Sequence, residues 1–360
     1  MTERTALYPG TFDPITLGHL DVIQTSASIF DKVVIGLLIN PSKSPRFDEQ
    51  ERKEMIEETI AKLGIINVKV KAFKGLTVEL ARQEKAVAII RGLRLTTEYE
   101  QELNIIFNNQ VLAPDIISIL IPPRQNHIHI SSSVVRELLN FGHPSLSDYV
   151  PQSVLNRIKL WNICCRLSHN LPDPEPVRVF YKTLIQCYQG RPYHNLNHIV
   201  GCLNELEEVR TQLKTPEAVE MALLFHDAVY DTHAKDNEEK SAELSKKIIK
   251  SLFLADAFGE EVARLILATK HNVPPTDVDA QFIVDIDLAP LGYSEEEFRK
   301  NTEKIRKEYS WVSDEQFREG RAKFMSSILA RPIIYQTLFF REKYEAQARR
   351  NIIHYMGETK

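Results

Sequence analysis

Short apolar runs alternate with amphipathic segments through the first half of the chain. We expect strands at residues 6–8, 33–39, 68–70, 87–90 and 116–121, where few polar residues interrupt the run. Such runs are typical of strands that are buried on both faces of a parallel sheet. A helix is expected to begin after Asp48, because Glu51 and then apolar residues at helical spacing follow it. Alternating strands and helices predict an α/β domain, in which ligands bind beyond the carboxyl ends of the strands.

The second half has almost no strand pattern. From about Ser153 onward, apolar residues recur at helical spacing, and prolines and glycines separate the segments. This pattern predicts an all-α domain. We place the boundary between Pro151 and Pro176, near residue 162, which gives domains 1–162 and 163–360.

Composition narrows the class of protein. The 360 residues are 43% hydrophobic with a formal net charge of −4, which does not favour bulk binding of nucleic acid or of an anionic membrane. The N-terminus lacks an apolar signal core, and no apolar run approaches the roughly 18 residues of a membrane span. The four cysteines have no C-x-x-C spacing. We therefore expect a cytoplasmic protein with reduced thiols and with no nucleic-acid or membrane partner.

Four polar segments follow expected strands and begin expected helices. They are Thr11 to His19, the Pro-Ser-Lys around Lys43, Arg91 to Arg94, and Ser131 to Ser133. Helix starts with free N–H groups, together with lysine and arginine, are suited to binding phosphate. A single histidine such as His19 more often caps or packs a helix, but four such segments at one sheet edge favour a phosphate site. The chain has neither G-x-x-x-x-G-K-[ST] nor G-x-G-x-x-G, which argues against kinases and dehydrogenases.

Together the segments YPGTFDPITLGH, PSK, RGLR and ISSS resemble those of the phosphopantetheine adenylyltransferases over about residues 1–160. Cytidylyltransferases and the nicotinate- or nicotinamide-mononucleotide adenylyltransferases use the same Rossmann-like nucleotidyltransferase fold, but we expect RGLR to be absent from them. The resemblance implies adenylyl transfer from ATP, as its Mg²⁺ complex, to 4'-phosphopantetheine, which gives dephospho-CoA and pyrophosphate. It also implies a homo-oligomer, in this family a hexamer.

The resemblance assigns roles to individual residues. Thr11 and Lys43 would hold the acceptor phosphate, while Thr77 and Arg91 would also bind phosphopantetheine. The catalytic set would be Thr11, His19, Lys43 and Arg94. The ATP site would comprise Thr11, Phe12, His19, Gly92, Arg94, Glu102, His127, Ser131, Ser132 and Ser133. Two positions depart from the family pattern, because His127 stands where an aromatic residue is usual and Gln101 replaces a tyrosine.

The helical half contains ligand-type residues inside apolar segments. They occur as Tyr193-His194-Asn195-Leu196-Asn197-His198, Phe225-His226-Asp227-Ala228, a later His271, and Val284-Asp285-Ile286-Asp287. Burying a His-Asp pair costs several kcal/mol unless it is paired or coordinated. Mixed nitrogen and carboxylate ligands suit Mn²⁺, Fe²⁺, Ni²⁺, Co²⁺ or Zn²⁺. A hydrogen-bonded His–Asp network without a metal is the alternative interpretation.

The ordered set H…HD…D resembles the HD superfamily of metal-dependent phosphohydrolases over about residues 175–355. The expected metal ligands are His198, His226, Asp227 and Asp287, with His194 and Asp285 as competitors. His271 is expected beside a ligand or a substrate phosphate, and Asp231, Glu238 or Glu239 are available for a second metal. Three hypotheses stay open for this half: a phosphohydrolase, a module that senses a nucleotide without catalysis, and an oligomerisation domain.

Overall fold

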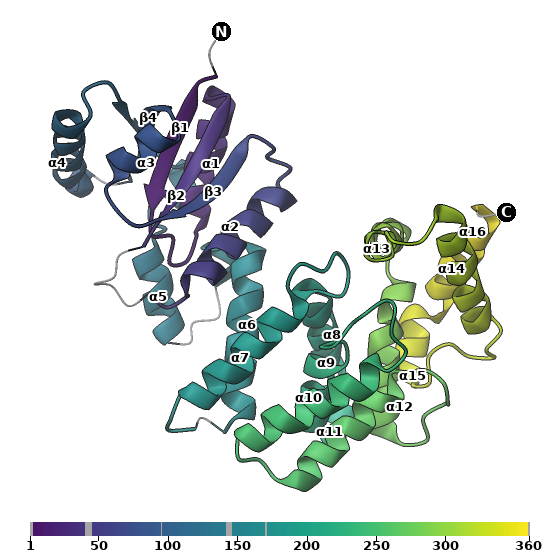
Figure 1. Cartoon of the computed structure of the whole chain (residues 1–360). Coiled ribbons are helices and arrows are strands. Elements are labelled where there is room, and N and C mark those ends of the chain that lie inside the picture. Colours follow the sequence, from purple (N-terminus) through teal and green to yellow (C-terminus); the bar gives the residue numbers. More distant parts are fainter. Residues whose placement is uncertain (1–2, 40–44, 95, 142–145, 170, 359–360) are drawn as a thin grey trace. The chain divides into compact units, whose positions relative to one another are not determined.

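The computed structural model describes residues 3–39, 45–94, 96–141, 146–169 and 171–358. The chain divides into two compact units, residues 1–158 and 159–360 (Figure 1). The division falls inside helix α6 (Gln152–Leu167), which also contains residue 162. In the described part of the chain, no helix is long and apolar enough to cross a membrane.

The first unit contains a five-stranded parallel sheet in the order β3-β2-β1-β4-β5. Its strands are β1 (Thr5–Gly10), β2 (Lys32–Leu38), β3 (Val68–Phe73), β4 (Ala86–Gly92) and β5 (Ile117–Ile121). Its other elements are α1 (Leu17–Ile29), α2 (Glu49–Lys62), α3 (Thr77–Gln83), α4 (Thr96–Leu112), η1 (Gln125–His127), α5 (Ser132–Asn140) and η2 (Leu146–Asp148). The α/β domain with a parallel sheet, which the strand–helix alternation predicted, is thereby confirmed.

The central strand β1 is buried on both faces. Ala6 and Tyr8 pack into one hydrophobic core, and Leu7 between them packs into another. Side chains alternate across a strand, so a continuous apolar run places residues in both cores. The prediction that this run forms a strand buried on both faces is therefore confirmed.

Helix α2 begins where its capping pattern predicted. The carboxylate of Asp48 accepts the backbone N–H of Glu51 at 2.9 Å, and Glu51 accepts the N–H of Asp48 at 3.0 Å. The buried guanidinium of Arg157, on α6, donates to Glu54 at 2.9 Å and Glu58 at 3.0 Å on α2. This contact fixes the first half of α6 to the sheet unit.

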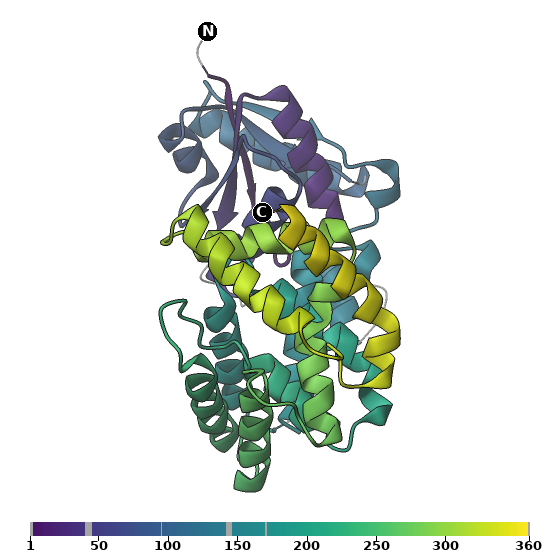
Figure 2. The ribbon, with the colours of Figure 1, turned by 90° about the vertical axis from the view of Figure 1, so that its right-hand side faces the viewer.

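The second unit is helical throughout its described residues. After α6 come α7 (Glu175–Tyr188), α8 (Leu196–Val209), η3 (Arg210–Gln212), α9 (Pro216–Phe225), α10 (Asn237–Ser251), α11 (Asp256–Ala268), α12 (Val278–Leu288) and η4 (Ala289–Gly292). The last elements are α13 (Glu295–Glu308), α14 (Asp314–Leu329), α15 (Leu338–Phe340), the π-helical turn η5 (Arg341–Glu345) and α16 (Ala346–Glu358). Figure 2 shows α10 and α11 running side by side, and likewise α14 and α16.

The buried core of this unit joins α8, α9, α11 and α12. Helix α9 is apolar apart from Glu217 and Glu220, and each of its residues from Ala218 to Phe225 is buried. Such helices belong in the middle of a bundle. The polar His226 and Asp227 come directly after α9, so the fold brings them into the interior of the unit.

Candidate functional site

The carboxyl ends of β1 and β4 form the centre of the first candidate site. These two strands are neighbours in the sheet, and the chain order reverses between them. Thr11 follows β1, while Arg91 and Gly92 end β4 and Arg94 follows it. Ligands of parallel sheets bind at such a switch point. Thr77 begins α3 after β3, at the same edge. Lys43 lies outside the described residues.

His19 is held in one orientation and one tautomer. It lies in the first turn of α1, where its Nδ1 accepts the backbone N–H of Thr16 at 3.1 Å. An accepting Nδ1 leaves the proton of the neutral ring on Nε2. Burial, with a smaller effect of Arg94, lowers the pKa of His19 from 6.5 to about 4. His19 is therefore a neutral Nε2–H donor near pH 7.

The loop between β1 and α1 is fixed by residues that the sequence patterns did not single out. Buried Arg52 donates to the Thr11 carbonyl at 2.6 Å. The carboxylate of Asp13 accepts the N–H groups of Arg46 at 3.0 Å and Phe47 at 3.1 Å, which ties the segment before α2 to this loop. Of the residues that fix this loop, Asp13 alone lies inside the segment predicted to bind phosphate, and nothing in the sequence indicated which N–H groups its carboxylate would accept.

Phe12 is buried and has a φ of 45°. Its ring meets His19 edge to face, with centroids 5.0 Å apart. The side chain of Phe12 thus supports His19.

The two arginines at the end of β4 have different partners. Arg91 forms a bidentate ion pair with Glu102 of α4, at 2.6 and 2.9 Å. Arg94 donates to the carbonyl of Ile130 at 3.0 Å. The family resemblance assigned Arg91 to phosphopantetheine and Glu102 to ATP, whereas in the structure the two side chains pair with each other.

The start of α5 brings the serines to the same edge. Ser131 caps the helix by accepting the Val134 N–H at 3.1 Å, and Ser132 donates to the Pro14 carbonyl at 2.8 Å. The Ser133 hydroxyl accepts from Arg136 at 3.1 Å. The Ser132 contact joins α5 to the loop that contains Thr11.

His127 is partnered within the protein. Its Nδ1 lies 2.7 Å from the carboxylate of buried Asp21 on α1. The backbone carbonyl of His127 also lies close to Gly18, since a Cβ atom placed on Gly18 would be 3.5 Å from this carbonyl oxygen. The segment of His127 therefore packs on the start of α1, beside His19.

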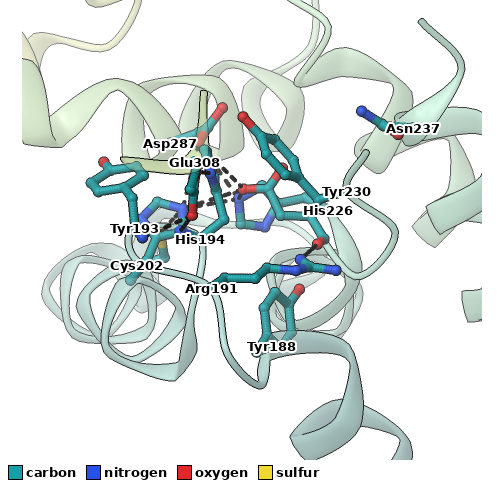
Figure 3. Close-up of polar contacts among 12 residues, drawn as sticks. Tyr188, Arg191, Tyr193, His194, Cys202, His226, Tyr230, Asn237, Asp287 and Glu308 are labelled. Atoms are coloured by element: carbon teal, nitrogen blue, oxygen red, sulfur yellow. Dashed lines mark hydrogen bonds and ion pairs between the residues drawn. The ribbon is translucent and has the colours of Figure 1, made fainter. Parts of the chain in front are cut away.

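In the second unit the four residues predicted as metal ligands lie together. Figure 3 labels two of them, His226 and Asp287. His226 Nε2 lies 3.3 Å from His198 Nε2, 3.1 Å from an Asp227 oxygen and 3.5 Å from an Asp287 oxygen. His198 Nε2 lies 3.5 Å from the same Asp227 oxygen. Ligands bonded at about 2.1 Å to one ion are separated by about 3.0–3.4 Å from their neighbours. The spacing of these atoms fits a single divalent metal.

The two histidines of this four-residue cluster turn Nε2 toward the carboxylates. His226 Nδ1 donates to the Leu223 carbonyl at 2.8 Å, so in the neutral ring Nε2 has the lone pair that can bind a metal. Burial lowers the pKa of His198 and outweighs the opposing effect of Asp227. The lowered pKa keeps the ring of His198 neutral. Burial would raise the pKa of Asp287, but hydrogen bonds from His226 and His271 outweigh it and lower that pKa. Burial lowers the pKa of His226, but the Asp227 and Asp287 carboxylates outweigh it and raise that pKa well above its usual value. A bound metal would therefore displace a proton from His226, while His198 is already neutral and the two carboxylates are ionised.

Two further histidines support the cluster from outside. His271 Nε2 lies 2.8 Å from the second oxygen of Asp287. His194 Nδ1 lies 2.6 Å from Glu308, and its ring stacks on Tyr230 with centroids 3.9 Å apart. Glu308 was not expected from the sequence, because it lies over 100 residues away on α13.

Cys202 offers an alternative ligand, since its sulfur lies 3.8 Å from His198 Nε2. Burial raises the pKa of its thiol well above the usual value. A protonated thiol is a poor ligand. The ligand set with the ionised carboxylates of Asp227 and Asp287 is therefore favoured over the set that contains Cys202.

Asp285 and Asp287 face different surroundings. The buried carboxylate of Asp285 accepts the backbone N–H groups of Gln336 and Thr337, each at 2.7 Å, and the Thr337 hydroxyl. It therefore holds the turn before α15, away from the cluster.

We predict that Asp285→Ala lowers the free energy of unfolding of the helical unit by about 2–4 kcal/mol, because two buried N–H groups lose their acceptor. Urea denaturation of the full chain measures this change. Metal content at a temperature where the variant is folded should stay at the wild-type level. Loss of metal without loss of stability would contradict this assignment of Asp285.

A cavity of about 580 Å³ opens beside the cluster. His194, His198, Asp227, His271 and Asp287 line one part of it, and Glu238 adds a carboxylate. Of the other residues proposed for a second metal, Asp231 accepts the N–H of His233, and Glu239 pairs with Lys270.

Arg191 fixes the backbone of the turn that contains Asp227. It donates to the Asp227 carbonyl at 2.5 Å and to the Ala228 carbonyl at 2.9 Å, and it lies over the rings of Tyr188 and Tyr230 (Figure 3). No pattern in the sequence singles out Arg191 beyond its place shortly before Tyr193 and His194.

A protein-family model described as cytidylyltransferase-like matches residues 7–138. The phosphopantetheine adenylyltransferase of Methylacidiphilum infernorum is 40% identical over 156 residues, which cover 43% of this chain and 90% of the relative. That of Caldanaerobacter subterraneus is 41% identical over 155 residues, covering 43% and 95%. Among solved structures, the nicotinic acid mononucleotide adenylyltransferase of Plasmodium falciparum complexed with NaAD aligns with 18% identity and a TM-score of 0.35, covering 44% of this chain and 96% of that one. By its likeness to these curated relatives, the chain belongs to the phosphopantetheine adenylyltransferase family.

Proposed function

We propose that the first unit transfers an adenylyl group from ATP to 4'-phosphopantetheine, and that the second unit is a metal-dependent phosphohydrolase of the HD type. The family membership of the chain supports the first activity. The spacing of four ligand atoms beside a cavity supports the second.

Adenylyl transfer needs positioning and charge stabilisation more than a strong base. The attacking phosphate monoester is largely ionised near pH 7, because its second pKa is about 6. Thr11, with Lys43, would direct this nucleophile. His19 would donate its Nε2–H to the α-phosphate, where charge builds up, and Arg94 and Ser132 would bind the departing pyrophosphate. Mg²⁺ bound to ATP neutralises part of the triphosphate charge.

Arg91 and Glu102 set the acceptor side of the site. Their bidentate contact presents the guanidinium at the end of β4 in a fixed direction. We propose that phosphopantetheine or ATP contacts this pair from the side that Glu102 leaves open.

The purified chain, given ATP, Mg²⁺ and 4'-phosphopantetheine, should form equal amounts of dephospho-CoA and pyrophosphate. Chromatography and a coupled pyrophosphate assay measure the two products. Cytidine triphosphate or nicotinate mononucleotide, offered in place of ATP or of the acceptor, should give little product. Preference for either of these would contradict the proposed activity.

In the second unit, His198, His226, Asp227 and Asp287 would hold Mn²⁺, Fe²⁺, Ni²⁺, Co²⁺ or Zn²⁺. A divalent metal in such a site supplies a water of lowered pKa as the nucleophile toward a phosphate ester. His271 would keep Asp287 oriented through its second oxygen, and Arg191 would fix the backbone of Asp227.

The alternative is a nucleotide-sensing or assembly module without catalysis. This alternative is the better explanation if the cluster binds no metal, or if it binds metal and a panel of phosphate esters is not hydrolysed.

For the hydrolase, Glu238 also lines the cavity and would be the carboxylate that moves a proton during hydrolysis, since it is not among the four proposed metal ligands.

A further inference from the structure

The wall of the cavity formed by α13, α14 and the turn between them is aromatic. Tyr309, Trp311, Phe317 and Phe324 line it. The Trp311 indole donates to the hydroxyl of Thr232 at 2.8 Å and stacks on His233 with centroids 4.0 Å apart. These contacts fix the indole beside the cavity. Aromatic side chains held in this way bind planar rings well.

Arg321 on α14 is the cation of this wall. Its Nε is shielded from solvent and has no hydrogen-bond partner, and its guanidinium lies over the ring of Phe324 at 5.6 Å. Within the described residues, no carboxylate forms an ion pair with it. The shielded Nε–H without an acceptor carries an uncompensated desolvation cost, which a bound anion would offset.

Arg321 lines the same cavity as the metal cluster, and Tyr193 and Tyr230 line it as well. Those two rings contact His194, at 4.7 and 3.9 Å between centroids, and Tyr193 also contacts His198. The cation and the cluster therefore border one cavity.

We propose that this cavity binds a phosphate monoester that carries a planar aromatic ring and has the size of a mononucleotide. The phosphate lies between the cluster and Arg321, and the ring lies against the aromatic wall near Trp311. A volume of about 580 Å³ accommodates a ligand of that size. The carboxylates of Asp227, Asp287 and Glu238 repel a phosphate, so the inference rests on the proposed metal for the strength of binding.

The chain contains two tryptophans, Trp161 and Trp311, and both lie in the second unit. In a Trp161→Phe protein, fluorescence therefore reports on Trp311 and is not produced by the nucleotide site of the first unit. The probe is an AMP analogue in which a methylene replaces the ester oxygen, titrated into Zn²⁺-loaded and EDTA-treated full-length protein. Adenosine and methylphosphonate test the ring and the phosphate separately.

We expect the analogue to quench Trp311 saturably, and either fragment alone to bind at least about tenfold more weakly. Arg321→Gln should weaken the analogue at least about tenfold, while Arg318→Gln, an exposed arginine on the same helix, should change binding less than about twofold. Circular dichroism shows whether each variant is folded, and Arg321→Lys provides a second, more conservative test.

Three results would overturn the inference: no response of Trp311, unchanged binding by folded Arg321→Gln, or equal binding of methylphosphonate and the analogue. Zinc content of the same samples separates this inference from the proposed hydrolase. Zinc-loaded protein that ignores the analogue overturns the ligand inference alone. Protein that holds no zinc but binds the analogue weakly through Arg321 overturns the metal site and leaves the class of ligand standing.

Discussion

His19→Ala should lower kcat for dephospho-CoA formation about 100- to 1000-fold, the usual cost of losing one donor to a developing negative charge. The KM for ATP should change much less, because the hydrogen bond strengthens mainly in the transition state. Steady-state kinetics with ATP and 4'-phosphopantetheine measure both constants. His169→Ala, which removes an exposed histidine of the second unit, is the control and should leave both unchanged.

The same variant tests the protonation state of His19. Its pKa lies near 4, so the ring is neutral throughout the range from pH 6 to pH 8. Protonation of the acceptor phosphate affects wild type and variant alike, and it cancels in the ratio of their rates. We expect this ratio to stay constant from pH 8 to pH 6. A ratio that rises as the pH falls would mean that the imidazolium is the active form.

Asp227→Ala should lower the rate of phosphate-ester hydrolysis at least about 100-fold. Loss of a residue that only supports a metal ligand lowers activity about 10- to 100-fold, and loss of the ligand itself should lower it more. Adenylyl transfer by the same sample should be unchanged, because Asp227 lies in the other unit. The assay uses Mn²⁺-loaded protein, p-nitrophenyl phosphate and a panel of nucleoside monophosphates. Asp256→Ala, at an exposed helix start, is the matched control.

An Asp227→Ala protein that still hydrolyses these esters at the wild-type rate would place the activity elsewhere. A wild-type protein that hydrolyses none of them while holding metal would favour the sensing module.

Much of the fold could be predicted from local patterns. The apolar run of β2 and the capping pair Asp48 and Glu51 are signals within a few residues of each other. The Ser131 cap is of the same kind, because a helix start and its hydroxyl are adjacent in sequence. The strand ends then followed from the parallel sheet, which collects them at one edge.

The partners of the site residues could not be predicted in this way. Arg91 meets Glu102, His127 meets Asp21 and His194 meets Glu308 across separations that only tertiary packing decides. None of these pairs has a local signal, since a charged side chain can turn to any of several neighbours.

Asp285 and Asp287 show a different limit. Residues two apart on a helix point about 200° away from each other, so only one of the two can face a given partner. Helix α12 is buried nearly all round, and its apolar pattern does not reveal which face meets the cluster. Packing places Asp287 beside His226, and Asp285 under the turn at Thr337.

The central claim is that this chain joins a nucleotidyltransferase to a metal site made by residues of its helical half. Elemental mass spectrometry of the full-length protein, after incubation with Mn²⁺, Fe²⁺, Ni²⁺, Co²⁺ or Zn²⁺ and removal of excess, tests it most directly. The account predicts close to one transition metal per chain in the wild type and in Asp256→Ala, and almost none in a folded His226→Ala/Asp227→Ala variant. No metal in the wild type, or equal metal in the wild type and the double variant, would contradict it.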